Sequence, residues 1–108
     1  MSKKPLIAYL TCPDQEIAGQ IARQLVAQRH AACVNMLPGL VSTYRWQNKI
    51  ETDTETLLMI KTTDSAFPDL QDAVLALHPD ELPEIIAVPI SMGLPGYLSW
   101  VAQETTPE

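Results

Sequence analysis

The stretch that decides the fold is Ala31–Thr63, which reads AACVNMLPGLVSTYRW (31–46), QNK (47–49) and IETDTETLLMIKTT (50–63). Both arms are rich in the β-branched and aromatic residues that fit a pleated surface. The polar break between them contains Asn48, which tolerates a positive φ. The pattern predicts a β-hairpin whose arms are about twice the usual 5–6 residues. Pro38 and Gly39 predict a kink or bulge in the first arm.

Such a hairpin is too long for the rest of the chain to cover. A domain of this length carries only a few helices, and each of them covers a limited area of sheet. We therefore expect the far end of the hairpin to contact another subunit.

The segments on either side of the hairpin predict an α+β fold. Before the hairpin, the pattern predicts a strand at 5–11 and a helix at 14–29 that is capped by Thr11 or Asp14. After it, the pattern predicts a helix that starts at 63–65, with Asp64 or Ser65 as its cap, and ends at His78. A strand at 85–90 and a terminal helix at 95–103 complete the chain. Two successive βαβ units with right-handed crossovers give a ferredoxin-like βαββαβ sandwich, with both main helices on one face of the sheet. We expect a single domain over residues 1–108, with the opposite face of the sheet left for another subunit.

Composition limits the partners. The chain has 108 residues, of which 46% are hydrophobic, and a formal net charge of −6. This charge argues against nucleic acid or an anionic membrane, because phosphate binding needs clustered Lys and Arg. The apolar run Leu6–Leu10 is shorter than the core of a signal peptide, which takes about 7–15 residues. We expect a cytoplasmic protein with Cys12 and Cys33 as free thiols.

Eight short motifs follow one another along nearly the whole chain. They are Thr11–Asp14 (TCPD), Ala31–Asn35 (AACVN), Leu37–Gly39 (LPG), Tyr44–Trp46 (YRW), Ile60–Thr63 (IKTT), Leu77–Pro79 (LHP), Pro83–Ile86 (PEII) and Tyr97–Trp100 (YLSW). Their succession resembles the CutA divalent-cation-tolerance family. The resemblance implies a ferredoxin-like fold, a tight homotrimer in which the hairpin reaches neighbouring subunits, and a role in tolerance to divalent metals, copper above all. It also implies a trimeric architecture similar to that of the PII signalling proteins, which bind small ligands between subunits.

The resemblance implies a copper site, but this chain matches only one of the three ligand positions proposed for the family. Proposed copper ligands in the family are a Cys near the end of the first strand and two adjacent His before the Pro that ends the second helix. Here His78 matches the second His, while Leu77 and Leu10 stand at the other two positions. Cys12 shares a strand face with Leu10. The candidate ligands for Cu(II) or another divalent cation are therefore His78, Cys12 and Glu84, since imidazole and thiolate suit copper.

The other polar and aromatic residues of these motifs are candidates for an intersubunit pocket. They are Trp46, Lys61, Tyr97, Trp100 and Cys33. Each also has a plain packing interpretation. Lys61 follows a run of apolar residues, so its ammonium must reach solvent or pair with a carboxylate, for which Glu84 is a candidate.

Several functions stay open at this point. The first is a trimeric divalent-cation tolerance protein that binds copper. The second is a PII-like trimeric regulator with a small ligand in its clefts, although the chain has no glycine-rich phosphate loop. The third is a structural trimer that supports another protein. The sequence has no nucleophile elbow and no HExxH motif, so we do not expect an enzyme.

Overall fold

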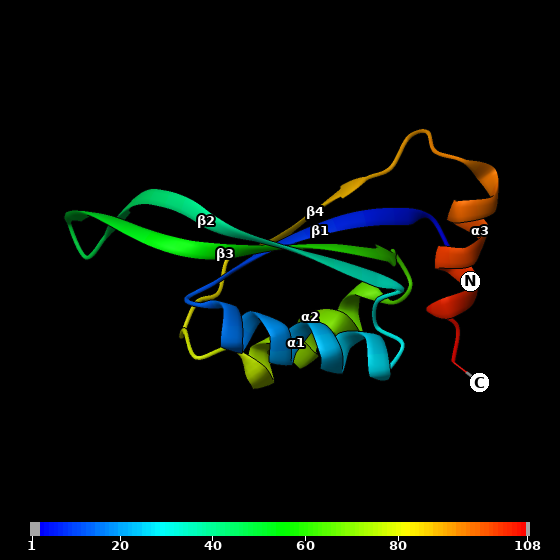
Figure 1. The fold of residues 1–108 in the computed structure, drawn as a ribbon, viewed down its shortest axis with the longest axis horizontal. Coiled ribbons are helices and arrows are strands. Elements are labelled where there is room, and N and C mark those ends of the chain that lie inside the picture. The colour runs from blue at the N-terminus through cyan, green and yellow to red at the C-terminus, as the bar shows by residue number, and fades with distance from the viewer. Residues whose placement is uncertain (1–2, 108) are drawn as a thin grey trace.

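A computed structural model describes residues 3–107 as one antiparallel sheet with three helices (Figure 1). The elements are β1 (Pro5–Cys12), α1 (Gln15–Ala27), β2 (Cys33–Trp46), β3 (Lys49–Thr63), α2 (Phe67–Leu77), β4 (Ile85–Pro89) and α3 (Pro95–Glu104). The strand order is β2-β3-β1-β4, and every neighbouring pair is antiparallel. This confirms the ferredoxin-like α+β fold. Within residues 3–107, no helix is both long and apolar enough to cross a membrane.

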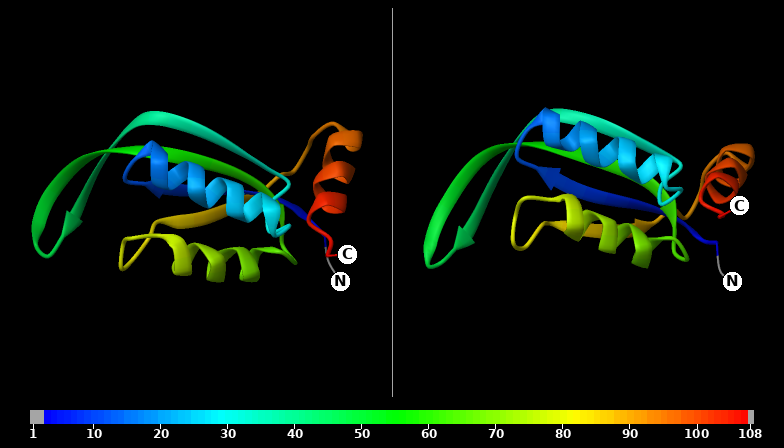
Figure 2. Two further views of the ribbon diagram at one scale, coloured as in Figure 1. Left: turned by 60° about the horizontal axis from the view of Figure 1, so that its bottom comes forward. Right: turned by 90° about the horizontal axis from the view of Figure 1, so that it is seen from below.

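The long hairpin is confirmed. Its arms, β2 and β3, have 14 and 15 residues. Gln47 and Asn48 both have positive φ, as a two-residue turn of this kind requires. The register shifts between Leu37 and Leu40, and Gly39 has a φ of 85°, so the expected bulge is present. The arms extend well beyond the other strands and curve over one side of the molecule (Figure 2).

Two helix boundaries differ from the prediction by two residues or more, and the other helix ends differ by one residue at most. Helix α1 ends at Ala27 rather than at residue 29, because Arg29 has a φ of 61°, outside the helical region. Its start was predicted correctly, since the Asp14 side chain accepts the Ile17 N–H. Helix α2 begins at Phe67, with Ala66 at the N-cap and no side-chain cap. The Asp64 carboxylate accepts the N–H of Lys4 instead, which joins the start of β1 to the end of β3.

The hydrophobic core lies between the sheet and the pair α1 and α2, which cover the same face (Figures 1 and 2). The strands contribute alternate residues to it: Ala8, Leu10 and Cys12 from β1, and Leu58 and Ile60 from β3. The helices contribute Ala18, Ile21, Leu25, Leu70 and Val74. All ten are almost completely buried. Period-two alternation therefore sends the intervening strand residues to the opposite face.

That opposite face has no helical layer over it within residues 3–107, because α3 packs at one end of the sheet (Figure 1). The register aligns its side chains in rows across the strands. One row contains Asn35, Met59, Tyr9 and Ile86, and the next contains Cys33, Lys61, Ile7 and Val88. Ile86 and Val88 are 56% and 41% exposed. We call this surface the uncovered sheet face. Its apolar content is what the sequence predicted for a surface that contacts another subunit.

Candidate functional site

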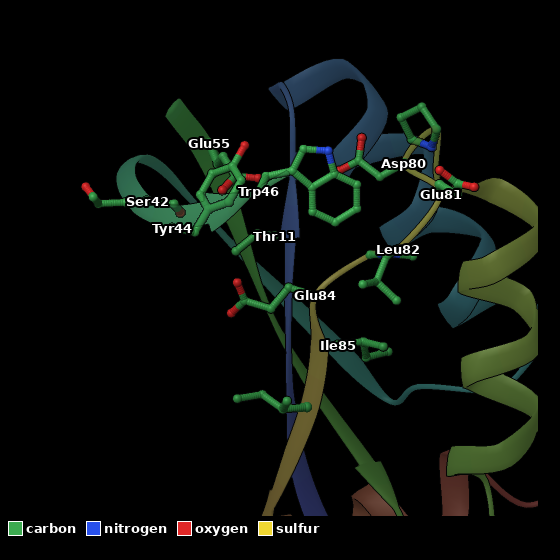
Figure 3. A pocket seen from close by; sticks show the side chains of 14 residues that line it. Thr11, Ser42, Tyr44, Trp46, Glu55, Asp80, Glu81, Leu82, Glu84 and Ile85 are labelled. Carbon is green, nitrogen blue, oxygen red and sulfur yellow. The ribbon is translucent and has the colours of Figure 1, made fainter. Parts of the chain in front are cut away.

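A hollow of about 890 Å³ lies where the hairpin curves towards the loop between α2 and β4 (Figure 3). Its wall contains two aromatic side chains, Tyr44 and Trp46, from β2. It also contains four carboxylates: Glu55 from β3, and Asp80, Glu81 and Glu84 from the loop. The remaining lining residues are Thr11, Ser42, Thr43, Pro79, Leu82, Pro83, Ile85 and Ile86. We call this hollow the hairpin cavity.

Strand alternation explains the hairpin side of the cavity. Ser42, Tyr44 and Trp46 are two residues apart along β2, so their side chains share one face. Figure 3 shows the Trp46 indole between Tyr44 on the hairpin and Asp80 on the loop. The Tyr44 hydroxyl donates a hydrogen bond to the Asp53 carboxylate. This bond, with smaller contributions from desolvation and from the charges of nearby carboxylates, raises the pKa of Tyr44 to about 12.

His78 fixes the loop side. Its imidazole is buried, Nε2 lies 2.8 Å from the Thr11 carbonyl oxygen, and Nδ1 lies 3.0 Å from the Asp80 backbone nitrogen. Because a carbonyl only accepts, Nε2 carries the proton and Nδ1 accepts the Asp80 N–H. The Thr11 N–H also donates to the Glu84 carbonyl oxygen, at 3.4 Å. These bonds connect both ends of the acidic loop to the end of β1.

The candidate copper ligands lie in this region but are not arranged as a metal site. Both imidazole nitrogens of His78 are engaged. Cys12 is fully buried in the core, and burial, with smaller contributions from Glu55, Asp80 and Asp14, raises the pKa of its thiol to about 12. A metal ligand must be a thiolate, which is the form that this environment disfavours. Among residues 3–107, no three His, Cys, Asp or Glu side chains are grouped closely enough to hold a metal ion.

The residues predicted to line an intersubunit pocket lie in two different regions of the fold. Trp46 lines the hairpin cavity together with Glu84. Cys33 pairs with Lys61 across the strands, and the Cys33 side chain is within hydrogen-bonding reach of Tyr97 on α3. Burial and this neighbouring thiol raise the pKa of Tyr97. The Tyr97 and Trp100 rings contact each other, with centroids 5.6 Å apart.

The suggested Lys61–Glu84 ion pair is wrong for the described chain. Lys61 pairs with Ile7 on β1, whereas Glu84 lies beside Thr11. Thr11 is four residues from Ile7, which corresponds to about 13 Å along a strand. Lys61 is half-buried on the uncovered sheet face, away from Glu84.

Sequence reasoning missed part of the cavity wall. Glu55 alternates with Glu51 and Asp53 along the second arm of the hairpin, a pattern typical of a solvated acidic face, and Asp80 and Glu81 belong to an acidic loop that contains prolines, so neither pattern marks a site in the sequence. The sequence signal for this part of the wall is the pair Pro38 and Gly39. The bulge at these residues curves the hairpin, and this curvature turns one face of its tip towards the loop (Figure 2).

Residues 6–104 match the family described as CutA1 divalent ion tolerance protein. This match covers nearly the whole described chain and includes the hairpin, the loop and α3. The chain belongs to the CutA1 divalent ion tolerance family. The resemblance inferred from the eight motifs is thereby confirmed.

Individual relatives agree with the family assignment. The chain is 50% identical to the divalent-cation tolerance protein CutA of Thermus thermophilus over 99 residues, which are 92% of this chain and 96% of that protein. It is 49% identical to the mouse protein CutA over 98 residues, and it spans 55% of the length of that relative.

Solved structures support the same fold. A Thermus thermophilus structure described as divalent cation tolerance protein (Cut A1) superposes with a TM-score of 0.93 at 48% identity, over 94% of this chain and 99% of that one. CutA1 from Oryza sativa gives a TM-score of 0.94 at 37% identity, over 99% of this chain and 98% of that one. Both solved structures therefore share the overall fold of this chain, because each superposition covers 94% of it or more.

Proposed function

We propose that this CutA1 family protein acts in divalent-cation tolerance as a cytoplasmic homotrimer, and that it acts by binding rather than by catalysis. The proposal rests on the uncovered sheet face and on the adjoining hairpin, which extends past the other two strands of the sheet (Figure 1). An apolar surface of this extent favours a protein–protein contact. Other copies of the same chain are the partner that the family resemblance implies.

The geometry supports a ring of copies. Strands β2 and β4 are both edges of the described sheet, and the end of the hairpin extends past the other strands of its own chain (Figure 2). A hairpin that reaches the next copy makes a head-to-tail contact, in which two different surfaces meet. Such contacts close into a ring when the rotation between copies permits. Three copies is the number that the resemblance implies.

A growth assay tests this function. A host strain that lacks its own CutA1 family gene is grown with increasing copper(II) or zinc(II), with or without this chain. We expect the wild-type chain to restore growth and Met59→Glu, at equal expression, to fail, because the new carboxylate lies in the middle of the uncovered sheet face. Failure of the wild type, or equal growth with both chains, would contradict the proposal.

The copper site stays a separate prediction. His78 and Cys12 are close to each other, since the imidazole bonds to the carbonyl of the residue next to Cys12. The donor set nevertheless fits copper poorly, because both imidazole nitrogens are engaged, the thiol is neutral and buried, and Glu84 is exposed in the cavity. We infer that tolerance does not depend on a preformed site at these three residues.

Calorimetric titration of copper(II) into chelator-stripped protein tests that inference. We expect weak binding that is unchanged in Cys12→Ala and His78→Gln, because neither side chain is free to coordinate. A Glu16→Gln variant, altered at an exposed carboxylate on α1, is the control for non-specific binding. Binding of one ion per chain that is lost in the His78 and Cys12 variants, but kept in the control, would establish a copper site.

A further inference from the structure

Lys61 is the only charged side chain in the two rows that cross the uncovered sheet face. It is already half-buried in the single chain. Among residues 3–107, no carboxylate forms an ion pair with it. Glu84 of the same chain lies about 13 Å away along the strands. A copy that covers this face therefore buries an ammonium group that the described part of its own chain leaves without a carboxylate.

Burying this ammonium group without a partner is unfavourable. A charged group loses its hydration when it leaves water, and buried charges in proteins are accordingly paired. Since the pair does not form within the described chain, we expect the carboxylate to come from the copy that covers the face. Lys61 therefore requires an acidic surface opposite it.

The hairpin cavity is such a surface. Four carboxylates line it, and no Lys, Arg or His side chain is among the described residues of its wall. Neighbouring carboxylates repel one another, so a cation that enters between them is stabilising. The described chain provides only the acidic half of this arrangement.

The cavity and Lys61 both belong to surfaces that we assign to contacts between copies. Ile86 lies in the cavity wall and also in a row of the uncovered sheet face. Tyr44 and Trp46 lie near the end of the hairpin, which extends past the other strands (Figure 2). In a head-to-tail ring, two different surfaces meet at each contact. The cavity of one copy and the sheet face of the next are two such surfaces, and their charges are opposite.

Glu84 is the cavity carboxylate closest to the sheet. It directly precedes β4, and its carbonyl oxygen accepts the Thr11 N–H, whereas Asp80 and Glu81 lie further back along the loop (Figure 3). Lys61 is also the basic residue that lies on the uncovered sheet face. The other Lys and Arg residues lie before β1 (Lys3, Lys4), on or after α1 (Arg23, Arg29) and near the hairpin turn (Arg45, Lys49).

We propose that the Lys61 ammonium group of one copy enters the hairpin cavity of the neighbouring copy and pairs there with Glu84. This inference rests on the proposed homotrimer and identifies the ion pair that selects which surfaces of neighbouring copies meet. One such pair at each contact also brings a positive charge to the acidic cavity of a chain whose formal net charge is −6.

A charge swap within one chain tests the pair. Lys61→Glu and Glu84→Lys, each alone, should raise the concentration at which half of the trimers dissociate about tenfold or more, because each places like charges opposite one another. The two changes combined in one chain restore opposite charges at every contact. We expect the combined variant to return to within about threefold of the wild type. Sedimentation velocity over a dilution series, in urea where the wild-type trimer partly dissociates, measures this concentration.

Two matched controls separate a specific pair from an effect of net charge. Arg23→Glu, at an exposed position on α1, changes the charge as Lys61→Glu does and should dissociate like the wild type. Asp72→Lys, at an exposed position on α2 outside the cavity, should not rescue Lys61→Glu. Single variants that assemble like the wild type, no rescue in the combined chain, or equal rescue by Asp72→Lys would overturn the proposal.

An uncharged cycle keeps the test valid if a charge-reversed chain does not fold. Lys61→Gln and Glu84→Gln each remove one side of the pair, so their combination should weaken assembly no more than the stronger single change. Additive effects would contradict the pair. The mass of the wild-type assembly separates the two proposals: a monomer overturns the homotrimer and the pair together, whereas a trimer with additive glutamine effects overturns the pair alone.

Discussion

Replacing Met59 with glutamate should convert the protein from a trimer to a monomer. Met59 lies between Asn35 and Tyr9 in the middle of the uncovered sheet face, where we expect another copy to pack. A carboxylate buried there without a partner costs several kcal/mol per chain. In the isolated chain the same side chain is only half-buried, so the fold should tolerate it. Sedimentation velocity measures the change.

The matched control is Leu75→Glu. Leu75 is 54% exposed on α2, which lies on the opposite side of the sheet. This change introduces the same charge without touching the uncovered sheet face, so the control should sediment like the wild type. If Met59→Glu also sediments like the wild type, the uncovered sheet face is not the surface between copies.

Replacing His78 with leucine should lower the free energy of unfolding by about 2 kcal/mol or more. Leucine fills the buried position with an apolar side chain of similar size, but it cannot make either hydrogen bond of the imidazole. The Thr11 carbonyl then loses its partner in a buried position. Denaturant unfolding at one fixed protein concentration measures the effect, since assembly makes stability depend on concentration.

His78→Gln separates the hydrogen bonds from the volume of the side chain. The glutamine amide can still donate to the Thr11 carbonyl, so this variant should recover part of the lost stability. Equal stability of wild type and His78→Leu would show that the imidazole does not hold the loop.

The hairpin was predictable because its signals are local. Pro38 and Gly39 mark the bulge, and Asn48 marks the turn, and each acts through its own backbone conformation. The N-cap of the second helix was predicted wrongly, because Asp64 precedes the helix in the sequence but its carboxylate bonds outside it. It bonds to Lys4, which is distant in sequence and is brought near by the pairing of β1 with β3.

The candidate site was only partly predictable, because it depends on register and curvature. The motif residues do not reveal that Lys61 and Glu84 lie at different levels of the sheet, and only the strand pairing separates them. In the same way, His78 looks like a free ligand in the sequence. Only the fold shows that Thr11 and Asp80 occupy both of its nitrogens.

The most direct test of the central claim is multi-angle light scattering of the wild-type chain at micromolar concentration. We expect a mass about three times the 11.9 kDa of one chain, because other copies must cover the sheet face that α1 and α2 leave open. A mass of one chain would contradict it. The uncovered sheet face would then be exposed to solvent, and the proposed trimeric function would be wrong.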